Sequence, residues 1–160
     1  HTRARENKMG CDIHSRAEIK FGDEWETVTE AIWPSGWFKH DAPVTPYNVP
    51  YTVEPFRSRN YGLFGLLAGV RNYSDLTPLA EPRGVPEDAG DGWKAYVAEW
   101  GGELHSMSWF THAELLKART DLTESPAAYG ILEALIAALA PMTSLHQGGT
   151  EIRYVFGFDN

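Results

Sequence analysis

The chain has 160 residues and a formal net charge of −8, and 42% of its residues are hydrophobic. This length and apolar content suit one globular domain with a sizeable core, whereas the acidic balance disfavours duplex nucleic acid, which binds basic surfaces. No apolar run approaches the roughly 18 residues needed to span a bilayer, and the single cysteine, Cys11, excludes an internal disulfide. We therefore expect a cytoplasmic protein without a membrane partner.

The N-terminal end differs in character from the rest of the chain. Residues 1 to 8 (HTRARENK) are basic and without pattern, and Met9 resembles a natural start. We interpret residues 1 to 8 as a tag or leader remnant and residues 9 to 160 as a single globular domain. Two domains within this length would each be too small.

The stretch from Cys11 to Val28 predicts a β-hairpin. Its first half alternates apolar and polar residues, which is typical of a strand with one buried face, and a turn is expected at residues 21 to 24. The polar face begins with Asp12 and His14. Side chains two residues apart on a strand project from the same face, so these two are expected to lie side by side.

Two segments rich in turns follow. Residues 32 to 55 carry five prolines, which remove backbone donors and block helix, so a long irregular loop is expected. The second segment, residues 73 to 92, shows no clear periodicity.

Residues 60 to 70 lie between these segments and predict a short buried helix, because they are apolar all round. Ser58 or Asn60 is the expected N-cap. Arg71 and Asn72 are expected at the C-terminal end, with the asparagine able to adopt the left-handed conformation.

The middle of the chain predicts a helix, an extended piece and a second helix. Apolar residues recur at helical spacing over residues 92 to 100, and residues 103 to 110 alternate. Thr111 and Glu114 have the spacing of a capping box, so a helix is expected to begin at His112.

The C-terminal part predicts a further helix and a strand. Ser125 is the expected N-cap, Pro126 the first helical residue and Leu139 the end of the apolar run. Residues 152 to 158 alternate as a strand and are expected to join the hairpin. The predicted fold class is α+β: a small, mainly antiparallel sheet made of the N-terminal hairpin and the C-terminal strand, packed with about four helices and long Pro-rich loops.

The Asp-x-His pair at Asp12 and His14 is typical of the opening of two-metal phosphoesterase sites. The pair can hold one divalent metal ion if a third ligand is near, and His105 is the preferred third ligand. Weaker candidates are Glu18, Asp75, Asp88 and His112. Two other interpretations stay open, a solvated polar face and acid–base contacts without metal. The remaining phosphoesterase segments are absent, so membership of that superfamily is not expected.

Four arginines lie in or beside the loops that flank the predicted buried helix: Arg57, Arg59, Arg71 and Arg83. The first amides of that helix would point toward the same place as Arg59, which is an anion-binding arrangement. A phosphate-bearing small molecule is the expected guest, although a carboxylate ligand fits the charge equally. Helix capping with a soluble surface is the alternative.

Four segments resemble a family of short, uncharacterised proteins of phages, prophages and some bacteria, whose members often begin Met-Gly-Cys-Asp-Ile-His. They are GCDIHSRAEIK directly after Met9, RNYGLFGLLAGVRN at 59 to 72, EPRGVPED at 81 to 88 and HSMSWFTHAELL at 105 to 116, roughly a third of the chain. The family has no known activity. The resemblance implies a family pattern that includes Asp12, His14, Arg59, Asn60, Arg71, Asn72, Arg83, His105 and Ser106.

Two functions remain as hypotheses, beside a third possibility, a small structural or assembly protein, which the acidic surface permits. The first is a phage-type enzyme that acts on a phosphate-bearing small molecule by metal-assisted hydrolysis of a phosphodiester or nucleotide. Its metal ligands would be Asp12, His14 and His105, its catalytic residues His105 and Ser106, and its ligand-binding residues Arg59, Asn60, Arg71, Asn72 and Arg83. The second is a non-catalytic protein that sequesters a nucleotide-like ligand or blocks a host defence protein in the host cytoplasm.

Overall fold

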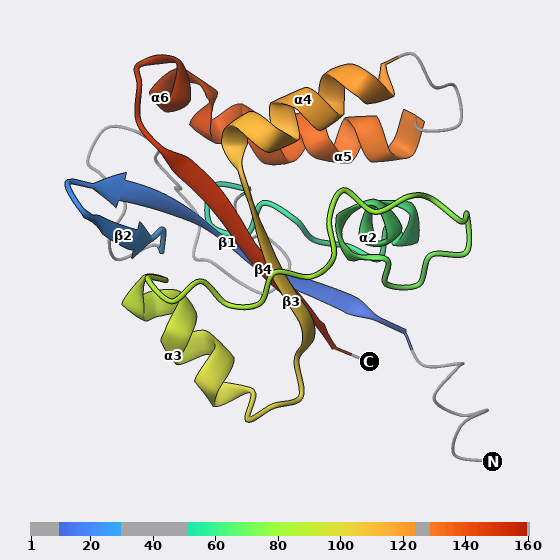
Figure 1. Ribbon diagram of the computed structural model, residues 1–160, viewed down its shortest axis with the longest axis horizontal. Helices are drawn as coiled ribbons and strands as arrows, with labels where there is room; N and C mark the ends of the chain where they lie inside the picture. Colours follow the sequence, from blue (N-terminus) through green and yellow to red (C-terminus); the bar gives the residue numbers. More distant parts are fainter. Residues whose placement is uncertain (1–9, 30–50, 124–128, 160) are drawn as a thin grey trace, which may run out of the picture.

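The computed structural model describes residues 10–29, 51–123 and 129–159 (Figure 1). Its centre is a four-stranded sheet of order β2-β1-β4-β3, in which every neighbouring pair is antiparallel. The strands are β1 (Asp12–Phe21), β2 (Glu24–Thr27), β3 (His105–Thr111) and β4 (Ile152–Asp159). Helices surround this sheet, so the predicted α+β fold class is confirmed.

The long central pair β1 and β4 sets the register of the sheet. Asp12 lies opposite Asp159 at one end, and Ile19 lies opposite Ile152 at the other. The predicted hairpin is present, with Lys20 opposite Trp25. The predicted extended piece becomes β3, an edge strand on the far side of β4.

One face of the sheet carries the main hydrophobic core. It is covered by α2 (Tyr61–Ala68), α4 (His112–Leu122) and α5 (Tyr129–Leu139). Alternate residues of β1 and β4 point into this core because successive side chains of a strand face opposite ways. Fully buried members include Ala17, Leu67, Leu115, Leu135, Tyr154, Phe156 and Phe158.

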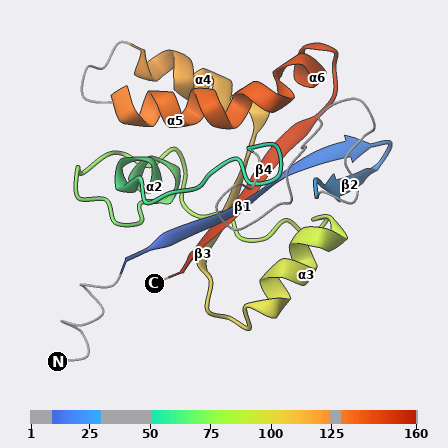
Figure 2. The same cartoon turned by 180° about the vertical axis from the view of Figure 1, so that it is seen from behind.

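The opposite face carries a second, smaller cluster under α3 (Asp91–Glu99). Trp93 is the buried residue of this helix and packs with Val155 of β4. The views in Figures 1 and 2 both place α3 across the sheet from α4 and α5. The predicted helix over residues 92 to 100 is therefore confirmed with a shift of one residue.

A buried ionic network fixes α3 to this face. The Glu18 carboxylate accepts hydrogen bonds from the Thr27 hydroxyl at 2.9 Å, the Gly90 amide at 2.7 Å and the Arg153 Nε at 2.8 Å. Arg153 also donates to Asp88 at 2.9 Å. Glu18 is fully buried. Its charge is satisfied by strands β2 and β4 and by the residue that precedes α3.

The helix predicted over residues 60 to 70 is α2, and its N-cap is Asn60, whose side chain accepts from the Leu63 amide at 3.1 Å. Its C-terminal end differs from the prediction. Gly69, rather than Asn72, takes the left-handed conformation there, with φ +71°. Glycine adopts this conformation without steric cost, so the helix ends before Asn72 is reached.

The α4 capping box is confirmed. The Thr111 hydroxyl accepts from the Glu114 amide, and the Glu114 carboxylate accepts from the Thr111 amide. After α5 the chain makes the 3-10 turn η2 (Ala140–Met142) and the short helix α6 (Thr143–Gln147).

Several predictions concern other parts of the chain. The expected cap at Ser125 and Pro126, residues 1 to 8 and most of the loop at 32 to 55 lie outside the described residues. Within the three described ranges, every helix is too short or too polar to cross a lipid bilayer.

Candidate functional site

His14 has two polar partners on the side of the sheet that faces α3. Its Nε2 lies 2.9 Å from Oδ2 of Asp159, and its Nδ1 lies 2.6 Å from the Tyr96 hydroxyl. The His14 side chain is mostly buried but keeps 14% of its surface exposed. We call this row of three side chains the Asp159–His14–Tyr96 relay.

Three elements bring the relay together. The antiparallel pairing of β1 with β4 places Asp159 opposite Asp12, whose amide donates to Oδ1 of Asp159 at 3.2 Å. Helix α3 supplies Tyr96, which stacks on the buried Trp93 with ring centroids 5.6 Å apart. It also supplies Trp100, whose ring packs against His14 at 4.6 Å. The imidazole is thus held by hydrogen bonds at both nitrogens and by an aromatic wall.

The surroundings keep Tyr96 in its neutral form. Burial raises the pKa of Tyr96 above its usual value, so the phenol carries its proton at neutral pH. It can then donate to Nδ1 of His14 in the tautomer whose Nε2 donates to Asp159. The Arg16 guanidinium lies 4.5 Å from the Tyr96 ring centroid. A carboxylate behind an imidazole is an arrangement that supports acid–base chemistry.

Asp12 makes an ion pair beside the relay. Nε of Arg59 lies 2.8 Å from Oδ1 of Asp12, and the second guanidinium nitrogen lies 3.4 Å from Oδ2. The hydrogen bond from Arg59 lowers the pKa of Asp12. Both side chains are about half exposed. Exposed ion pairs of this kind contribute little to stability, so an anionic ligand can draw Arg59 away at small cost.

The structure does not bring His105 to the predicted metal pair. His105 lies opposite Phe158, with the two rings 6.1 Å apart, on the sheet face that carries the main core. Asp12 and His14 project from the other face. Across the described ranges, no group of three His, Cys, Asp or Glu side chains is arranged to hold a metal ion. These residues do not fit the expected site as they stand, and the divalent ion stays a prediction.

Three of the four weaker metal candidates are engaged elsewhere. Glu18 and Asp88 both bind Arg153. His112 is fully buried, and its Nδ1 lies 2.6 Å from the Tyr154 hydroxyl.

The two predicted catalytic residues do contact each other. Nδ1 of His105 lies 3.0 Å from the Ser106 hydroxyl oxygen. Ser106 has φ +53°, and the register of β3 against β4 shifts between His105 and Ser108. A serine in the left-handed region costs on the order of 1 kcal/mol or more, and this bulge stores that strain at the edge of the sheet.

Arg83 forms a clamp within the protein. Its guanidinium donates two hydrogen bonds to the Glu114 carboxylate, at 2.8 and 2.6 Å, and a third to the Trp109 carbonyl at 3.2 Å. Glu114 is also part of the α4 capping box. Arg83 therefore connects its own loop, between α2 and α3, to the start of α4.

The two predicted asparagines act on the backbone. Asn60 caps α2, and Asn72 exchanges two hydrogen bonds with the backbone of Leu76, at 2.7 and 2.9 Å. These hydrogen bonds give both asparagines a role in stabilising the local backbone.

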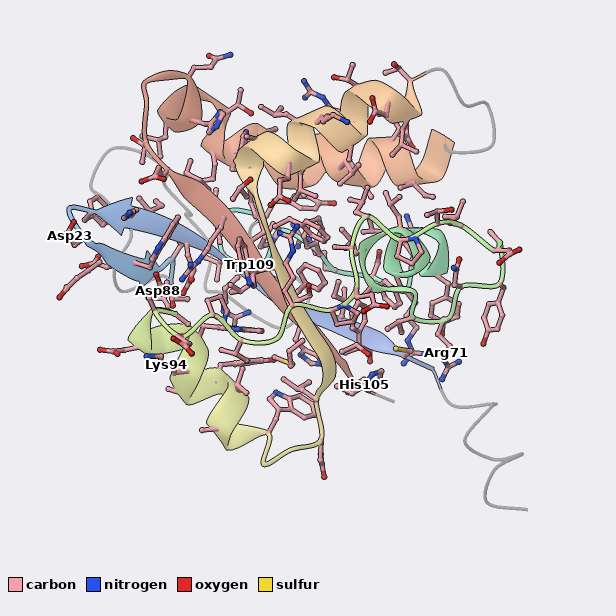
Figure 3. All side chains as sticks on the ribbon, in the orientation of Figure 1. Asp23, Arg71, Asp88, Lys94, His105 and Trp109 are labelled. Carbon is pink, nitrogen blue, oxygen red and sulfur yellow. The ribbon has the colours of Figure 1, made fainter. Side chains whose placement is uncertain are left out.

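Arg59 and Arg71 come together at the start of β1. Burial raises the pKa of the Cys11 thiol, and the charges of both arginines oppose this rise, so both lie within electrostatic range of Cys11. Figure 3 shows Arg71 beside the start of β1. Arg59 is connected to the relay through Asp12, whose amide donates to Asp159.

Sequence reasoning missed three residues of the site: Tyr96, Trp100 and Asp159. The two aromatic residues have helical spacing with Trp93, which predicts a helix but no role in a site. Asp159 lies on the polar face of a strand that was expected to join the hairpin. That alternation was the available signal, but it lacks the register that pairs Asp159 with β1.

Comparison with protein-family models, with curated proteins and with solved structures finds no match to this chain. The fold and the site together define an α+β protein that carries the hydrogen-bonded Asp159–His14–Tyr96 relay at one end of an antiparallel sheet.

Proposed function

We propose that the protein binds a phosphate-bearing small molecule where β1 begins and β4 ends, and hydrolyses it by acid–base chemistry at His14. The observation that carries this proposal is the Asp159–His14–Tyr96 relay, with distances of 2.9 and 2.6 Å. Arg16 and Arg59 are the neighbouring cations that support a phosphate ligand.

The relay supports a general-base step. A water molecule that takes the place of the Tyr96 hydroxyl at Nδ1 can give its proton to His14 as it attacks phosphorus. Asp159 stabilises the imidazolium that results, and the P–O bond to the leaving group breaks. The imidazolium then returns the proton to the leaving oxygen, so His14 ends in its starting state. The arginines offset the negative charge that develops on the phosphoryl oxygens.

The test is hydrolysis of a panel of nucleotides and of bis-p-nitrophenyl phosphate. His14→Gln is expected to lower kcat by about 100-fold or more, which is the usual contribution of a general base. Asp159→Asn should also lower kcat, because it weakens the stabilisation of the imidazolium. His146→Gln, a histidine of α6, is the matched control. Full activity in His14→Gln would overturn the proposal.

Two further measurements separate this proposal from the metal-assisted hydrolysis predicted from the sequence. Activity that is lost on treatment with a chelator and restored by a divalent ion would support the metal site. Loss of activity in His105→Gln, with His14→Gln active, would move the chemistry to the His105–Ser106 contact.

A specific observation favours binding without catalysis as the second candidate. Both nitrogens of His14 and both carboxylate oxygens of Asp12 already have partners within the protein. In this alternative the protein sequesters a nucleotide-like ligand or blocks a host defence protein. A ligand that raises the melting temperature equally in wild type and His14→Gln, without turnover, would support it.

A further inference from the structure

Tyr73 is the most exposed large hydrophobic side chain in the described part of the chain, with 73% of its surface accessible. It lies in the turn that follows α2. A single exposed aromatic residue is common on protein surfaces and needs no explanation by itself. The ring of Tyr73, however, also contacts two of its neighbours.

Two side chains hold the ring. Tyr61 packs edge to face against it, with ring centroids 6.0 Å apart and an interplanar angle of 68°. A guanidinium nitrogen of Arg71 lies 3.4 Å from the Tyr73 hydroxyl. These two contacts leave most of the Tyr73 side chain accessible.

The backbone of the turn is also fixed. The Tyr73 amide donates to the Arg71 carbonyl at 2.8 Å, and the Asp75 amide donates to the Asn72 carbonyl at 3.2 Å. Arg71 and Asp75 both have positive φ, at +48° and +53°. Non-glycine residues in this region cost free energy, so the surrounding contacts must over-determine the turn.

The turn connects directly to the proposed site. The Tyr61 hydroxyl accepts from the Cys11 amide at 3.1 Å, and the next residue, Asp12, holds Arg59. The Arg71 guanidinium lies 5.6 Å from the Tyr61 ring centroid. The exposed ring of Tyr73 and the guanidinium groups of Arg71 and Arg59 therefore lie in the same region of the surface.

We propose that Tyr73 is a stacking platform for a nucleobase, and that Arg71 and Arg59 face the phosphate of the same ligand. This inference rests on the proposed function for the phosphate and narrows its substrate class to nucleotides. Bases stack on aromatic side chains, and guanidinium groups match phosphate oxygens. The net charge of −8 favours a free nucleotide over a nucleic acid chain, because a polyanion is repelled by the acidic body.

The experiment is a calorimetric titration of the wild-type chain, Tyr73→Leu and Tyr73→Trp with four probes: adenosine monophosphate, guanosine monophosphate, ribose 5-phosphate and adenosine. Tyr73→Leu is expected to weaken nucleotide binding by about 5-fold to 150-fold and to leave ribose 5-phosphate unchanged. Tyr73→Trp should keep the affinity. The matched control is Phe21→Leu, an aromatic side chain 47% exposed at the other end of β1.

The outcomes separate the platform from the proposed function. Unchanged nucleotide affinity in Tyr73→Leu, or an equal loss for ribose 5-phosphate, would overturn the platform and leave the proposed function standing. Adenosine that binds as tightly as its monophosphate, with both lost in Tyr73→Leu, would keep the platform and remove the phosphate requirement. If none of the four probes binds the wild-type chain, the platform is wrong, and the proposed function is decided separately by the hydrolysis panel. Unfolding curves without ligand check that each variant is folded.

Discussion

His112 illustrates how a single buried residue makes stability depend on pH. Its Nδ1 lies near the Tyr154 hydroxyl, while its Nε2 has no hydrogen-bond partner among the described residues. The His146 ring lies 4.4 Å away. Burial, followed by the charges of His146 and Arg119, lowers the pKa of His112 to about 4. The imidazole is therefore neutral in the folded protein at neutral pH.

We predict that the protein loses stability as the pH falls from 7 to 4. The unfolded chain takes up a proton at His112 near pH 6.5, whereas the folded protein does so only near pH 4. Between these values the unfolded state binds more protons, so acid favours unfolding, by about 3 kcal/mol in total from this group. Urea denaturation at a series of pH values measures this. His112→Gln should have a flatter profile, and an identical slope in the variant would contradict the assignment.

At the scale of elements, caps and buried polar contacts fix the helices that carry the site. The capping box of α4 joins Thr111 to Glu114, and the Glu18 network joins α3 to the sheet. The capping box lies at the junction of β3 and α4, whereas the Glu18 network joins β1, β2 and β4 to the residue that precedes α3. The position of Tyr96 relative to His14 therefore depends on contacts away from the relay itself.

Thr111→Ala is expected to lower the free energy of unfolding by about 1 kcal/mol, because the Glu114 amide loses its acceptor. Denaturant unfolding gives the value. Thr120→Ala, an exposed change within the same helix, should alter stability by about 0.5 kcal/mol or less. Equal effects of the two changes would show that the cap contributes nothing.

Glu18→Gln is expected to lower the free energy of unfolding by roughly 3 kcal/mol or more, because it leaves the buried Arg153 without its closest counter-charge. Ligand binding at the relay should weaken as well, since α3 is no longer fixed. The exposed change Glu26→Gln in β2 is the matched control for both readouts. A Glu18→Gln variant as stable as this control would contradict the role of the network.

The sequence predicts local structure well here and the site poorly, for a physical reason. Alternation in residues 11 to 21 and the capping box at Thr111 are signals contained within a few residues, and both are confirmed. The relay joins His14 to Asp159 across 145 residues, and no local pattern contains that register. The predicted third ligand, His105, lies on the other face because the register of β3 places it opposite Phe158, whose side chain belongs to the main core.

At the scale of the whole molecule, the two faces of the sheet differ in how firmly they are packed. The main core includes residues from three helices, and β4 is buried from residue 152 to 158. Helix α3 on the other face has one buried residue, Trp93. The face of the sheet that carries the relay is thus covered by fewer buried side chains than the other face.

We expect amide hydrogen exchange to be faster in α3 than in α2, a helix of similar length with six buried residues. Local opening requires less apolar surface to be exposed in α3, so its free energy should be smaller. Exchange measured by NMR or mass spectrometry tests this, with β4 as the slow reference. Protection of α3 equal to that of α2 would show that the Glu18 network compensates for the thin core.

The alternation of β1 also has an evolutionary consequence. Ile13, Ala17 and Ile19 lie in the core, while His14 and Glu18 on the opposite face make specific polar contacts. Apolar positions accept other apolar residues of similar volume, whereas a charge that satisfies several partners has almost no substitute. Selection on this strand should therefore follow a period of two, with drift permitted on one face and nearly forbidden on the other.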